Sequence, residues 1–79
     1  MIFLRFEGGG EIVVLNINRE EKKFSIASSK TEYEMKERPW KELFDKEGEE
    51  EQTEKLGDRE FKEVIVNTMK HNGYELKNA

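Results

Sequence analysis

The chain has 79 residues and no cysteine, so it can form one small domain and excludes disulfides, thiolate zinc sites and cysteine nucleophiles. Apolar residues make up 34% and charged residues 41%, and the single histidine excludes mechanisms that need two. The net charge is −4, all of it in residues 41–79, which argues against direct nucleic-acid binding. No apolar run is long enough for a signal peptide or a membrane span, so we expect a cytoplasmic protein that does not bind membranes.

The first two predicted strands are Ile2–Glu7 and Glu11–Ile17, joined by the glycines at positions 8–10 in a β-hairpin. Two registers are open: Leu4 lies opposite Val14, or the pairing slips by one residue and places Leu4 opposite its neighbour Val13. The second strand has apolar side chains on both faces. We therefore expect it to be central or covered on both sides, a second copy of the chain being one such cover.

Alternation predicts two further strands, Lys22–Ser28 and Thr31–Lys36, the second with Tyr33 and Met35 facing inward. Short connections between successive strands are typical of antiparallel sheets. Residues 1–36 therefore predict a β-meander.

Residues 39–46 predict a short amphipathic helix, because Pro39 suits a first helical turn and Trp40, Leu43 and Phe44 share one side. Residues 47–55 contain no apolar residue, so nothing in their composition offsets the entropy of ordering them. They predict a flexible acidic loop.

The main helix is predicted over residues 58–72, with Asp58 as N-cap and Gly73 in the left-handed conformation that ends a helix. His71 falls in its last turn, where a cation is favoured. The helix carries one apolar stripe: Phe61, Val64, Ile65, Thr68 and Met69. Residues 74–77 alternate and predict a short fifth strand.

Together these elements predict a single α+β domain over residues 1–79. Its sheet has four to five mainly antiparallel strands, beginning with the N-terminal β-meander. The short helix and the longer C-terminal helix pack on one face of that sheet.

No group of residues predicts catalysis. Glu49, Glu50 and Glu51 lie in a run with no apolar neighbours to shift a carboxyl pKa, and the spacing of this run differs from that of a calcium loop. The glycine triplet lacks the Gly-Lys-Ser/Thr end of a phosphate-binding loop. We therefore predict a protein without enzymatic activity, cofactor or bound metal.

The function we predict instead is a small interaction module that binds another macromolecule. The charge favours a protein partner with a basic surface, as for an acidic inhibitor or adaptor of a nucleic-acid enzyme of the phage or mobile-element type. Phe3 stands on the opposite side of its strand from Ile2 and Leu4, and Trp40 starts an element; each anchors a partner or packs locally. The predicted partner-binding residues are Phe3, Trp40, Asp45, Glu47, Glu49, Glu50, Glu51 and Glu54.

The alternative is a protein that binds a small molecule or nucleotide in a pocket at a dimer interface. The turn Ser28-Ser29-Lys30-Thr31 offers three hydroxyls and an ammonium for an anion, with Trp40 and Tyr74 as further candidates. A small enzyme is the least favoured alternative.

Overall fold

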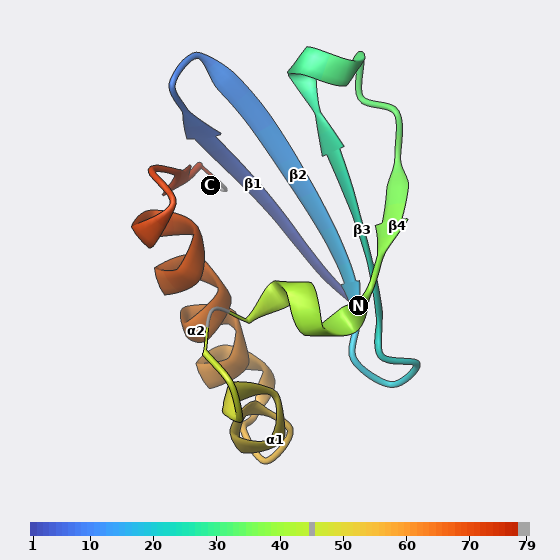
Figure 1. Cartoon of the computed structure of the whole chain (residues 1–79), viewed down its shortest axis with the longest axis vertical. Helices are drawn as coiled ribbons and strands as arrows, with labels where there is room; N and C mark the ends of the chain where they lie inside the picture. The colour runs from blue at the N-terminus through green and yellow to red at the C-terminus, as the bar shows by residue number, and fades with distance from the viewer. Residues whose placement is uncertain (45, 78–79) are drawn as a thin grey trace.

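Residues 1–44 and 46–77, which the computed structural model describes, form a five-stranded antiparallel sheet with the α-helices on one of its faces (Figure 1). The strands are β1 (Ile2–Gly8), β2 (Glu11–Asn18), β3 (Lys23–Ser28), β4 (Lys36–Arg38) and β5 (Glu75–Leu76). The helices are the 3-10 helices η1 (Ser29–Thr31) and η2 (Trp40–Leu43) and the α-helices α1 (Glu49–Thr53) and α2 (Asp58–His71). The strand order is β4-β3-β2-β1-β5, so the predicted α+β class and the central position of β2 are confirmed.

The β1–β2 hairpin has neither of the two predicted registers. Leu4 lies opposite Leu15, which leaves only Gly9 and Gly10 in the turn. Both have positive φ angles, +57° and +78°, as a two-residue type I′ turn requires. This turn fixes the register and places Leu4 and Leu15 together on the buried face.

Gly8 pairs with Glu11 and so belongs to β1 rather than to the turn, and the chain after α2 passes very close to it. A Cβ atom at this position would lie 2.3 Å from the carbonyl oxygen of Gly73 and 2.9 Å from Cδ1 of Tyr74. Only glycine lets the segment before β5 approach β1 this closely.

The core lies between the sheet and α2. Phe61 and Ile65 of α2 are buried against the inward-facing side chains of β1, β2 and β3, which are Leu4, Phe6, Leu15, Ile17 and Phe24. The Trp40 ring of η2 stacks on Phe61 with centroids 6.0 Å apart, and Phe44 packs edge-on against both rings. Phe61, Ile65 and Met69 of the predicted apolar stripe therefore lie on the side of α2 that faces the sheet, and Val66, which is not part of the predicted stripe, packs against the same core.

The fourth strand begins later than predicted. β4 covers Lys36–Arg38 rather than Thr31–Lys36, and the side chains of Tyr33 and Met35, predicted to face inward, are 49% and 47% exposed. The prediction of a strand over residues 31–35 is wrong.

Local hydrogen bonds explain this difference. The Ser28 hydroxyl accepts a bond from the backbone N–H of Lys30, and the Thr31 hydroxyl donates to the Ser28 carbonyl. Glu32 and Tyr33 follow in the left-handed conformation, with φ of +56° and +60°. Hydroxyl side chains that bond their own backbone favour a turn over a sheet ladder.

The segment 47–55, predicted to be a loop, contains α1. Thr53 is only 2% exposed, and Arg19 from the β2–β3 turn holds this segment in place. Its Nη2 atom donates to the carbonyls of Thr53 (3.2 Å) and Leu56 (2.7 Å), and its guanidinium lies 4.3 Å from the centre of the Phe61 ring. Arg19, from another part of the chain, thus provides stabilising contacts that the apolar-free segment 47–55 does not supply itself.

The predicted start of the main helix is partly wrong, and its end is confirmed. Gly57, not Asp58, is the N-cap, and the Asp58 carboxylate accepts a hydrogen bond from Arg19 Nη1 at 2.7 Å. At the other end Gly73 has φ +90°, and the N–H groups of Gly73 and Tyr74 donate to carbonyls of the last helical turn. The short helix predicted over residues 39–46 is the 3-10 helix η2 at Trp40–Leu43.

Candidate functional site

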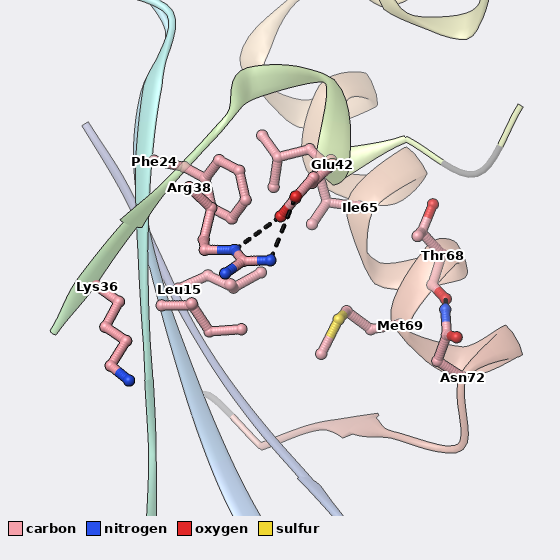
Figure 2. A pocket seen from close by; sticks show the side chains of 11 residues that line it. Leu15, Phe24, Lys36, Arg38, Glu42, Ile65, Thr68, Met69 and Asn72 are labelled. Atoms are coloured by element: carbon pink, nitrogen blue, oxygen red, sulfur yellow. Dashed lines mark hydrogen bonds and ion pairs between the residues drawn. The ribbon is translucent and has the colours of Figure 1, made fainter. Parts of the chain in front are cut away.

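The first candidate site is a groove of about 440 Å³ between α2 and the β3–β4 side of the sheet (Figure 2). Its walls are apolar, formed by Leu15, Phe24, Ile26, Leu43, Ile65 and Met69. Its rim is polar, formed by Lys36, Arg38, Glu42, Thr68 and Asn72. The volume lies within the range of about 300–1,000 Å³ that is usual for small-molecule sites, which combine apolar walls with a few polar groups.

The cations of the rim come from β4. Lys36 pairs with Ile26 and Arg38 pairs with Phe24, so both point toward the groove. Arg38 donates to the Glu42 carboxylate from Nε (2.8 Å) and Nη2 (3.2 Å), as the dashed lines in Figure 2 show. Among the described residues the Lys36 ammonium has no hydrogen-bonding or ionic partner.

The groove exists because the sheet is wider than the helix that covers it. α2 packs over the inner strands, and β4 lies beyond its reach with all three residues exposed. The sequence patterns described above do not predict this groove. The sequence does contain one signal for it, the charged pair Lys36 and Arg38 at alternate positions, where a covered strand would carry apolar side chains.

The second candidate site is the sheet face opposite α2, which we call the uncovered face. It is formed by Phe3, Arg5 and Glu7 of β1, Ile12, Val14 and Asn16 of β2, Lys23, Ser25 and Ala27 of β3, Glu37 of β4 and Glu75 of β5. Within the described ranges, no helix packs against it, and Phe3 is 57% exposed. Carboxylates lie at both edges of this face, Glu37 on β4 and the neighbouring Glu7 and Glu75 on β1 and β5.

The structure places the predicted partner-binding residues on different sides of the molecule. Phe3 belongs to the uncovered face, whereas Trp40 packs on Phe61 on the helical side. Glu49, Glu50 and Glu51 form the first turn of α1, and Glu47 is exposed just before it. Glu54 forms an ion pair with Lys22, which raises the pKa of that lysine. Asp45 lies outside the described residues.

The predicted anion-binding turn, Ser28–Thr31, uses its hydroxyls within the fold. The Ser28 hydroxyl donates to Oε2 of Glu11, and the Ser29 oxygen accepts a bond of 2.9 Å from the backbone N–H of Ile12. The turn therefore already holds an anion, the Glu11 carboxylate, which would repel a second one.

Tyr74 completes this arrangement by donating from its hydroxyl to Oε1 of Glu11 at 2.6 Å. Hydrogen bonds from Ser28 and then Tyr74 lower the pKa of Glu11, because they favour its charged form. The same bond raises the pKa of Tyr74. Glu11 thus links β2 to the end of β3 and to the segment that leads into β5.

The titratable groups form no constellation for metal chemistry: over residues 1–44 and 46–77, no three His, Cys, Asp or Glu side chains come together to hold a metal ion. His71 is exposed in the last turn of α2, where the sequence predicts it. Within the same ranges no helix has the length and apolar character to cross a membrane.

In comparisons with known proteins, no family model, curated protein or solved structure matches this chain.

Proposed function

We propose that this chain is a non-enzymatic interaction module that binds a protein partner through the uncovered face. The observation that carries the proposal is the 57% exposure of Phe3 on a sheet face against which none of the described helices packs. Large aromatic side chains contribute much of the binding energy of protein interfaces. Val14 and Ile12 of the neighbouring strand add apolar side chains to the same face, and Asn16 lies directly opposite Phe3.

The charge around this surface favours a partner with a basic rim. Glu37 lies at one edge of the uncovered face and Glu7 and Glu75 lie at the other, and these three carboxylates outnumber the two cations of the face, Arg5 and Lys23. Complementary charges at the rim of an interface speed association and discriminate between partners. An acidic inhibitor or adaptor of a nucleic-acid enzyme is the version of this function that the net charge of −4 supports best.

The test compares Phe3→Ser with Tyr33→Ser, since Tyr33 is a second aromatic residue of similar exposure (49%) that lies outside the uncovered face. The partner is captured with the wild-type chain and purified, and affinities are measured by calorimetry. We expect Phe3→Ser to weaken binding at least about tenfold, which corresponds to about 1.4 kcal/mol. Tyr33→Ser should bind like the wild type.

Equal affinity of Phe3→Ser and the wild type would contradict the proposal. The mass of the chain in solution provides a second check. If the chain dimerises and Phe3→Ser abolishes the dimer, the uncovered face binds a second copy of the chain, and the proposal of a different protein partner is wrong.

A further inference from the structure

We propose that the groove between α2 and β3–β4 binds a medium-chain fatty acid, whose carboxylate lies at Lys36 and Arg38 and whose chain lies on the apolar walls. The groove is formed within one chain and lies on the opposite side of the sheet from the uncovered face. The site therefore does not depend on the proposed protein-binding function, and either can fail without the other.

The walls of the groove suit an alkyl chain. The sheet contributes Leu15 and Ile26. Ile65 and Met69 of α2 lie on the side of the groove that faces Leu15, as Figure 2 shows. These side chains are aliphatic or, in methionine, flexible and polarisable, and they adapt to an unbranched chain more easily than to a rigid ring. At about 440 Å³ the groove is near the lower end of the usual range for ligand sites, which favours a chain of medium length.

The rim of the groove suits a carboxylate. Lys36 and Arg38 bring two positive charges against the one negative charge of Glu42, in a protein whose net charge is −4. Arg38 uses Nε and Nη2 for Glu42, and Nη1 stays available to a second carboxylate. Because both cations lie on β4, they define the β4 side of the groove as the position of the head group.

Glu42 opposes the ligand. Its carboxylate occupies two donors of the Arg38 guanidinium and repels any anion that approaches the same rim. Removing its charge frees Arg38 for the ligand. Glu42→Gln should therefore bind a fatty acid more tightly than the wild-type chain does, whereas a purely hydrophobic site would be indifferent to this substitution.

The experiment titrates decanoate, below the concentration at which it forms micelles, into the full chain by calorimetry and by two-dimensional NMR of the backbone amides. We expect saturable binding, with shifts at Lys36, Arg38 and Met69. Lys36→Met should weaken binding at least about fivefold, and Glu42→Gln should tighten it by at least about twofold. The matched control, Lys55→Met, removes the same charge from a residue outside the groove and should stay within about twofold of the wild type.

Two control ligands and one further variant distinguish a fatty-acid site from nonspecific hydrophobic binding and from binding of any anion. Decylamine and inorganic phosphate should bind at least about tenfold more weakly than decanoate, because each lacks either the anionic head or the chain. Thr68→Phe, which fills the groove from α2 and leaves both cations in place, should abolish binding. Circular dichroism checks the fold of each variant. If Lys36→Met does not fold, the affinities of Thr68→Phe and Glu42→Gln for decanoate test the proposal.

The proposal is overturned if decanoate does not bind, or if its shifts map to Phe3 and Val14 on the uncovered face. Equal binding of decanoate and decylamine would also overturn it, as would a Thr68→Phe variant that binds like the wild type.

Discussion

At the scale of single residues, Glu11 shows how one carboxylate can join distant segments of the chain. It accepts hydrogen bonds from Ser28 on β3 and from Tyr74, which is 63 residues away in sequence. Both donors stabilise the charged form, so the pKa of Glu11 in the folded chain is below its value of 4.5 in an unfolded chain. The stability contributed by Glu11 is therefore present above about pH 4.5 and is lost as the pH falls through the lowered pKa.

This pH dependence of stability leads to a prediction for Tyr74→Phe, a variant that removes one hydrogen-bond donor to Glu11 and keeps the aromatic ring. The variant should melt at a lower temperature than the wild type at pH 7, and the difference should shrink as the pH falls through the lowered pKa of Glu11, below which the carboxyl group is protonated in both proteins. Thermal unfolding followed by circular dichroism over this range measures the effect. Tyr33→Phe is the control, because the Tyr33 hydroxyl does not bond to Glu11. A gap between Tyr74→Phe and the wild type that does not change with pH would show that the carboxylate is not the partner that matters.

At the scale of elements, Arg19 explains why the acidic segment forms a helix. It leaves the β2–β3 turn and bonds the backbone at the end of α1, while its guanidinium packs over the Phe61 ring of α2. Arg19 also pairs with Asp58, but that carboxylate is 80% exposed whereas the Arg19 side chain is only 21% exposed. Ion pairs exposed to solvent contribute little, so the bonds to the two backbone carbonyls should dominate.

Two substitutions separate these contributions. Arg19→Met keeps much of the packing and removes the hydrogen bonds to two carbonyls; it should lower the free energy of unfolding by about 2–3 kcal/mol. Asp58→Ala removes only the exposed partner and should cost less than about 1 kcal/mol. Urea unfolding of both variants gives the comparison. If Asp58→Ala were as damaging as Arg19→Met, the ion pair rather than the backbone bonds would hold α1 in place.

The same contacts explain which elements could be predicted from the sequence. β1, β2, β3 and α2 carry regular apolar patterns, and the structure has them within one residue of the predicted bounds. The start of β4 and the position of α1 depend instead on bonds that no pattern contains, such as the one between Arg19 and Thr53, 34 residues apart. The groove depends on how far α2 reaches across the sheet, which the periodicity of a single element does not specify.

At the scale of the whole molecule, the uncovered face and the acidic helix α1 lie on different sides. Phe3 and its neighbours lie on the uncovered face, whereas Glu49, Glu50 and Glu51 lie in α1 on the helical side. A partner seated on the uncovered face would not contact α1 directly. The charge of α1 acts on such a partner only through the long-range field, which salt screens over about 8 Å at physiological ionic strength.

This separation predicts different kinetic effects for the two surfaces once the partner of the proposed function is purified. Replacing Glu49, Glu50 and Glu51 by Gln should slow association several-fold at low salt and leave dissociation unchanged, because steering acts before contact. Phe3→Ser should speed dissociation and leave association nearly unchanged, because the ring acts after contact. Surface plasmon resonance at low and high salt measures both rates. High salt should remove the difference in association rate between the triple variant and the wild type. A triple variant that dissociates faster than the wild type at every salt concentration would place α1 inside the interface. That result would contradict the assignment of the interface to the uncovered face alone.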